Sequence, residues 1–157
     1  MKGKDIVTLL ICLTIPLVIG SISGILTAGN ITTWYVTLNK PGFNPPNYLF
    51  GPVWTLLYLL MGVSLYFVWQ APASVDKRNA LVIFAIQLAL NFAWSFLFFE
   101  FKQLGVALVE ILLLWACILA TIVLFSRINK TAAYLQIPYL LWVSFATLLN
   151  FSIWQLN

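Results

Sequence analysis

The chain has 157 residues, of which 62% are hydrophobic and only 8% are charged, and its mean hydropathy is +1.00. A soluble domain usually carries about 25% charged residues, so lipid must form part of the solvent of this chain. The net charge of +4 is too small and too scattered for a nucleic-acid-binding surface. The absence of histidine removes the commonest metal ligand and the usual general base, and no Ser-His-Asp arrangement is available.

Five apolar runs follow one another along the chain, at roughly 6–28, 48–70, 79–99, 104–126 and 133–155. Each is long enough to cross a bilayer, which takes about 20 residues. The first run follows basic residues, as a signal peptide would, but it is longer than a usual signal-peptide core and lacks a clear cleavage site. We interpret it as a retained helix. We therefore predict that residues 1–157 form one all-α membrane domain, a five-transmembrane-helix bundle.

The connection over 29–47 is the longest and contains Lys40-Pro41-Gly42-Phe43-Asn44-Pro45-Pro46. Proline fixes φ and removes a hydrogen-bond donor, so this segment is predicted to be a semi-rigid, non-helical cap. Pro52 and Pro138 also fall within apolar runs. Pro52 is expected in the first turn of the second helix, and Pro138 near the start of the fifth.

Lysine and arginine are distributed unevenly between the two ends of the predicted bundle. With the N-terminus inside, the inner side holds six of them: Lys2, Lys4, Lys77, Arg78, Arg127 and Lys130. The outer side then holds Lys40 and Lys102. Positive residues favour the inner side, so we expect an N-terminus inside, a C-terminus outside and the cap on the outer face.

Small residues recur one turn apart on the first and third runs. Gly20 and Gly24 form a GxxxG pattern, and the third run carries Ala85, Ala89 and Ala93. Both stripes suit close helix packing, either within the chain or against a second copy in a homodimer.

The third run also carries a polar stripe, Gln87, Asn91 and Ser95, about 200° round the helix from the alanines. Polar side chains avoid lipid, so this stripe is expected to face the bundle interior. Glu110 is an acidic residue that lies well inside one of the apolar runs, 104–126. It fits either a functional site or a structural role near a helix end, partly wet and bonded to a neighbouring helix.

Aromatic and polar side chains from several runs share the outer half of the bundle when depth is counted at about 1.5 Å per residue. They are Trp54, Tyr58, Asn91, Trp94, Glu110, Trp142, Ala146 and Asn150. We predict a cavity beneath the cap with aromatic walls, suited to a flat, largely apolar ligand. The tryptophans at run ends, Trp34, Trp69 and Trp154, also fit interface anchors, and Trp115 fits packing between helices.

Many of these residues belong to longer motifs. They are Trp34-Tyr35, Lys40-Pro41, Pro45-Pro46, Gly51-Pro52-Val53-Trp54 with Leu57-Tyr58 and Met61-Gly62, Gln87 through Trp94, Pro138 through Trp142, and Phe145-Ala146-Thr147 with Leu149-Asn150 and Trp154. Over nearly its whole length the chain resembles the translocator protein family, also called the tryptophan-rich sensory protein or peripheral benzodiazepine receptor family.

The resemblance implies a five-helix bundle, often dimeric, with a ligand cavity beneath the first loop. Members bind porphyrins such as protoporphyrin IX, and benzodiazepine-site drugs; bacterial members are associated with light-dependent breakdown of protoporphyrin by cavity tryptophans. The residues implied as ligand-binding are Trp34, Tyr35, Trp54, Tyr58, Asn91, Trp94, Trp142, Ala146 and Asn150. Trp54 and Trp142 are the implied photochemical residues.

One departure from the family pattern concerns cholesterol. The Leu…Tyr…Arg motif of eukaryotic members is replaced here by Leu149, Phe151 and Gln155, so tight cholesterol binding is not expected. Phe43 stands where many relatives have tryptophan.

The leading functional expectation is a porphyrin-binding receptor or sensor in a bacterial cell membrane, with no cofactor or metal and with the porphyrin as ligand or substrate. The alternatives are an enzyme that degrades protoporphyrin IX with light and oxygen, and a tetrapyrrole transporter.

Overall fold

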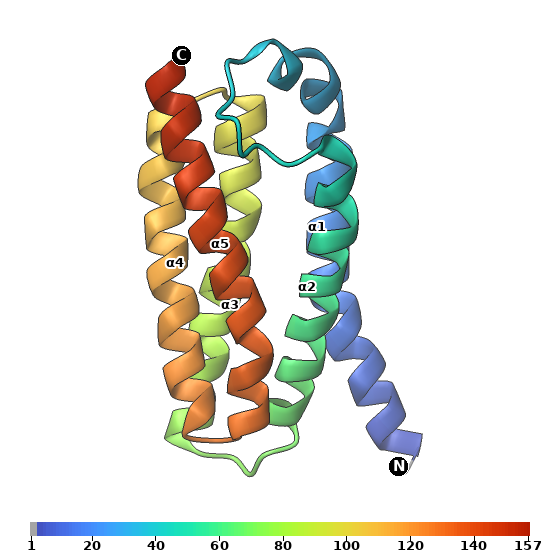
Figure 1. Ribbon diagram of the computed structural model, residues 1–157. Coiled ribbons are helices and arrows are strands. Elements are labelled where there is room, and N and C mark those ends of the chain that lie inside the picture. The colour runs from blue at the N-terminus through green and yellow to red at the C-terminus, as the bar shows by residue number, and fades with distance from the viewer. Residues whose placement is uncertain (1–2) are drawn as a thin grey trace.

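The computed structural model describes residues 3–157, in which five long helices stand side by side (Figure 1). They are α1 (Gly3–Thr33), α2 (Asn47–Trp69), α3 (Val75–Ser95), α4 (Leu104–Ser126) and α5 (Lys130–Leu156). A 3-10 turn, η1 (Tyr35–Thr37), follows α1, and a π-helical turn, η2 (Phe96–Glu100), continues α3. Five segments are long and apolar enough to cross a membrane, so the predicted all-α, five-span bundle is confirmed. Lys2, which entered the orientation prediction, lies outside the described residues.

The helices alternate in direction, so the two chain ends lie at opposite ends of the bundle (Figure 1). α4 packs against α3 and α5, while α1 packs mainly against α2, and α2 closes the bundle against α5. The connection between α1 and α2, residues 34–46, crosses the same end as the C-terminus. We call this connection the cap loop and this end the cap end.

The helix ends differ from the predicted runs because hydropathy measures the apolar stretch rather than the hydrogen-bonded helix. α1 continues to Thr33, beyond residue 28, and the Trp34 backbone N–H just after it still donates to the Asn30 carbonyl at 3.0 Å, in the helical i to i−4 pattern. The first part of the predicted non-helical cap is therefore helical. α3 and α5 begin earlier than predicted because Ser74 and Asn129 accept backbone N–H bonds as N-caps.

Both proline placements predicted near first turns were wrong. Pro52 lies in the second turn of α2, and Pro138 lies in the interior of α5. Each leaves the carbonyl four residues earlier without its helical partner. Those residues are Tyr48 and Tyr134, 75% and 64% exposed near helix ends, where water or lipid headgroups can satisfy the carbonyl.

The backbones of α1 and α2 approach closely at Gly62. A Cβ atom there would lie 2.7 Å from the Leu13 Cα and 2.9 Å from the Cys12 carbonyl oxygen. Close contact between membrane helices requires such small residues, because packing rather than the hydrophobic effect holds them together. Gly62 therefore sets the spacing of this helix pair.

Candidate functional site

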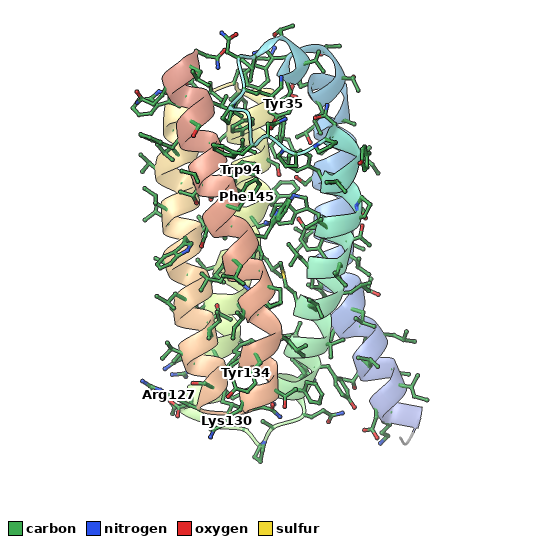
Figure 2. All side chains as sticks on the ribbon, viewed as in Figure 1. Tyr35, Trp94, Arg127, Lys130, Tyr134 and Phe145 are labelled. Carbon is green, nitrogen blue, oxygen red and sulfur yellow. The ribbon has the colours of Figure 1, made fainter. Side chains whose placement is uncertain are left out.

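A cavity of about 320 Å³ lies among α1, α2, η2, the end of α3 and α5. This volume is at the lower end of the range for small-molecule sites, about 300–1,000 Å³. Its wall includes Tyr35 and Trp94, which Figure 2 places in the half of the bundle nearer the cap end. Arg127, Lys130 and Tyr134 lie at the opposite end. The cavity therefore occupies the predicted half, beneath the cap loop.

Aromatic rings from α2 and α5 form much of the wall. Trp54 stacks on Tyr58 with ring centroids 5.6 Å apart and an interplanar angle of 26°, as their i, i+4 spacing on one helix face allows. The Trp142 ring makes edge contact with Phe50, with ring centroids 6.1 Å apart, and its centroid lies 5.4 Å from that of Phe145. The rings of Phe50, Trp54, Tyr58 and Trp142 line the cavity and offer flat apolar surfaces to an occupant.

A chain of hydrogen bonds fixes the Tyr58 ring and joins three helices. The Tyr58 hydroxyl donates to Asn91 Oδ1 at 2.7 Å, and Asn91 Nδ2 donates to the Tyr139 hydroxyl at 3.0 Å. Gly20 of α1 faces the same ring, and a Cβ atom on it would collide with Tyr58. Glycine at this position therefore makes room for Tyr58 in the wall.

A second pair of hydrogen bonds joins α3, α4 and α5 at the same level. Trp94 Nε1 donates to Asn150 Oδ1 at 3.1 Å, and Asn150 Nδ2 donates to the Leu104 carbonyl at 2.9 Å. The Asn150 amide thus accepts one hydrogen bond through its oxygen and donates one through its nitrogen. Trp94 is thus held in place by its nitrogen while its ring lines the cavity.

The cap loop is tied down at several points. The Tyr35 hydroxyl donates to Asn44 Oδ1 at 2.7 Å, and Lys40 Nζ donates to the Tyr35 and Leu38 carbonyls at 2.7 and 3.0 Å. Asn39 N donates to Asn157 Oδ1 at 3.0 Å, and Asn157 Nδ2 donates to the Asn39 carbonyl at 2.9 Å. The C-terminal end of α5 therefore holds the cap loop over the cavity.

Most residues implied as ligand-binding line this cavity: Tyr35, Trp54, Tyr58, Trp94, Trp142, Ala146 and Asn150. Two do not. Asn91 is 2% exposed and lies behind Tyr58, which it holds. Trp34 makes edge contact with Phe98 at 6.0 Å, outside the lining.

The α1 wall was missed by sequence reasoning. Gly20, Ser21, Ser23, Gly24 and Thr27 all line the cavity. The GxxxG pattern was interpreted as a packing motif, but a stripe of small residues equally leaves space for a ligand. The small residues could be recognised in the sequence. Whether they pack against another helix or leave space for a ligand depends on which residues lie opposite them in the fold.

The two stripes of α3 face opposite ways. Gln87 and Asn91 are buried, as predicted for the polar stripe, whereas Ala85 and Ala89 are exposed on the outside of the bundle. Trp115 donates its indole N–H to the Ser144 hydroxyl at 2.8 Å, between α4 and α5. It is not a lining residue, which supports the packing alternative.

Glu110 fits neither sequence expectation. It does not line the cavity, and it is only 8% exposed, with no hydrogen-bond partner for either carboxylate oxygen among residues 3–157. It is therefore neither part of the cavity wall nor partly wet and bonded to a neighbour. Depth along α4 was predicted correctly, but depth does not determine which face a side chain occupies.

Comparison with known proteins agrees with this architecture. The profile of the TspO/MBR family matches residues 12–155. The chain is 44% identical to the tryptophan-rich protein TspO of Chlorobaculum tepidum, over 99% of both chains. It is 40% identical to the translocator protein of Homo sapiens over 79% of this chain and 75% of that one, and 40% identical to the tryptophan-rich sensory protein of Cereibacter sphaeroides over 79% and 77%. The chain therefore belongs to the TspO/MBR family and is an integral membrane protein.

Proposed function

We propose that this protein is a membrane receptor or sensor that binds a porphyrin such as protoporphyrin IX in the cavity beneath the cap loop. The observation that carries the proposal is the aromatic wall, in which Trp54 stacks on Tyr58 and Trp142 lines the α5 side. A porphyrin is flat and largely apolar, and such rings offer it stacking surfaces. Benzodiazepine-site drugs would occupy the same cavity and compete.

The test is a titration of the purified protein in detergent with protoporphyrin IX in the dark, followed by the porphyrin absorption band. We expect saturable binding that Trp54→Phe weakens. Trp69→Phe is the matched control, because Trp69 lies at the other end of the same helix and is 53% exposed. An absorption change that never saturates, or one that both variants alter equally, would reject the proposal.

A second candidate function is breakdown of the bound porphyrin with light and oxygen. It is favoured by the position of Trp54, whose ring lies 5.6 Å from Tyr58 and 6.1 Å from Tyr139. These three oxidisable aromatic rings therefore lie next to one another, beside the porphyrin that the cavity would hold. Illumination of the complex in air should yield a new absorption band that Trp54→Phe and Trp142→Phe abolish even when enough porphyrin is added to saturate dark binding to each variant. Product formed equally by both variants would exclude this role for the two tryptophans.

We infer further that the chain lies in a bacterial cell membrane with its N-terminus inside. Lys77, Arg78, Arg127 and Lys130 adjoin the ends of α3, α4 and α5 opposite the cap end, as the positive-inside rule favours. In a chain lacking Cys12 and Cys117, a cysteine at position 76 should resist a membrane-impermeant maleimide in intact cells, whereas one at position 42 should react. If position 76 reacts and position 42 does not, the N-terminus lies outside and the proposed topology is wrong.

A further inference from the structure

The cavity is open to the outside between α1 and α2. Ser21 and Gly24 of α1 and Gly51 and Thr55 of α2 line it, and all four residues are also exposed. The two helices pack against each other and stand at one side of the bundle (Figure 1). We call the opening that these four residues border the α1–α2 gap.

The gap lies on the cap side of two tight contacts between the helices. Gly62 meets the α1 backbone at Leu13, and Gly20 meets the Tyr58 ring. Antiparallel helices advance by the same rise per residue, so the four gap residues face each other next towards the cap end. None of them is larger than threonine, and the Cβ position of Gly24 has no neighbour within 4 Å outside the backbone of its own helix among residues 3–157. This part of the helix pair is therefore unfilled.

The gap opens towards lipid. Gly51 and Thr55 come four and eight residues after the start of α2, or about 6 and 12 Å along the helix. Ile22, Ile25 and Leu56 adjoin gap residues in the sequence and are 45%, 76% and 57% exposed. Both helices are long and apolar enough to span a membrane, so these side chains face acyl chains. The gap therefore connects the cavity with the hydrocarbon part of the bilayer.

A hydrocarbon chain is the chemical group that fits this opening. Among the described residues that line the cavity there is no Asp, Glu, Lys or Arg, and an ionised group that passed into lipid would lose its hydration without a partner. A hydrocarbon chain has apolar surroundings both before and after it passes through, so it incurs no such cost. The cavity itself, at about 320 Å³, is small for a macrocyclic ligand, and the gap gives such a ligand room to extend.

Resting on the porphyrin-binding function proposed above, we propose that the α1–α2 gap is a subsite for a hydrocarbon substituent of the bound tetrapyrrole. The macrocycle lies against the aromatic wall, and the chain passes between α1 and α2 into the lipid. The ligands of this cavity then include tetrapyrroles esterified with a long-chain alcohol, because the length of the chain is not limited by the volume of the cavity.

The experiment compares the monomethyl and monohexadecyl esters of protoporphyrin IX, titrated in the dark into the detergent-solubilised protein. The two esters share the macrocycle and the free carboxyl group and differ in chain length. We expect both to bind saturably to the wild type. The measured quantity is the dissociation constant of the hexadecyl ester divided by that of the methyl ester. Partitioning of each ester into detergent is the same for every variant and cancels when these ratios are compared.

Gly24→Leu and Thr55→Leu should each raise this ratio at least about tenfold, because leucine on either side of the gap fills the space that the chain needs. Gly29→Leu is the matched control. Gly29 lies on the same helix as Gly24, its Cβ position likewise has no neighbour within 4 Å outside the backbone of its own helix among residues 3–157, and it does not line the cavity. This control should leave the ratio unchanged.

The possible failures of the two proposals can be told apart. Saturable binding of protoporphyrin IX without saturable binding of the hexadecyl ester would overturn the inference while leaving porphyrin binding intact. A ratio that neither leucine in the gap changes, or that Gly29→Leu raises equally, would overturn it as well. If neither protoporphyrin IX nor either ester binds saturably, the proposed function fails and this inference fails with it.

Discussion

The hydrogen-bonded chain through Asn91 predicts a reversal in the effect of one substitution. Tyr58→Phe removes the hydroxyl that donates to Asn91 Oδ1 at 2.7 Å. Asn91 is 2% exposed, so its oxygen has no access to water as a replacement partner. A buried polar group left unpaired costs about 1–3 kcal/mol, and we expect Tyr58→Phe to lower the free energy of unfolding by that amount.

The same substitution should be stabilising when Asn91 is absent. Asn91→Leu leaves the hydroxyls of Tyr58 and Tyr139 without their partner, and these residues are 8% and 1% exposed. Adding Tyr58→Phe then removes one stranded hydroxyl. The double variant should be more stable than Asn91→Leu alone by about 1–3 kcal/mol.

The assay is denaturant unfolding in detergent micelles, with the free energy extrapolated linearly to zero denaturant. Tyr48→Phe is the control, because Tyr48 lies on the same helix and is 75% exposed; it should change stability by less than about 0.5 kcal/mol. If Tyr58→Phe is equally destabilising with and without Asn91, the hydroxyl is not bonded to this asparagine and the reasoning is wrong.

Three further predictions concern single sites. Gly62→Ala should lower the free energy of unfolding by about 1–3 kcal/mol, because its Cβ meets the α1 backbone. Gly29→Ala, whose Cβ would have no packing neighbour within 4 Å outside the backbone of its own helix among residues 3–157, should not lower it, and equal losses would contradict this account. Glu110→Leu replaces a buried, unpartnered carboxyl group by an apolar side chain of similar size, so stability should rise by about 1–3 kcal/mol with porphyrin affinity unchanged; weaker binding would instead give Glu110 a part in ligand binding. Asn157→Ala removes two hydrogen bonds to Asn39, together about 1–3 kcal/mol, so a bound porphyrin should dissociate at least about fivefold faster in stopped-flow mixing. An unchanged dissociation rate would mean that the cap loop does not open when the ligand leaves.

The fold could be predicted because the bilayer leaves few choices. An apolar run of about 20 residues with few charges has to form a helix that satisfies its own backbone, and the five runs correspond to five spans. Short-range periodicity was equally informative. The four-residue spacing of Trp54 and Tyr58 puts both side chains on one face of the helix, and the rings stack.

The parts that could not be predicted depend on partners far away in the sequence. The bonds between Asn39 and Asn157 join residues 118 positions apart, and no local pattern indicates them. Glu110 was assigned the right depth, but its rotation around α4 depends on how that helix packs against α3 and α5. When all the helices are largely apolar, a single sequence predicts well how deep a residue lies in the bundle. It predicts poorly in which direction around the helix axis the side chain points.

The small residues of α1 show why the cavity needs both space and fixed walls. Gly20 accommodates the Tyr58 ring, while the Cβ position of Gly24 has open space around it among the described residues. Larger side chains at either position would fill the cavity or displace its wall. The wall itself is held by hydrogen bonds through Asn91 and Asn150, which fix α2, α3, α4 and α5 relative to one another. Membrane helices gain little from the hydrophobic effect when they approach each other, so these few polar bonds, together with close contact at Gly62, can set the helix spacing while the aromatic faces stay available to a ligand.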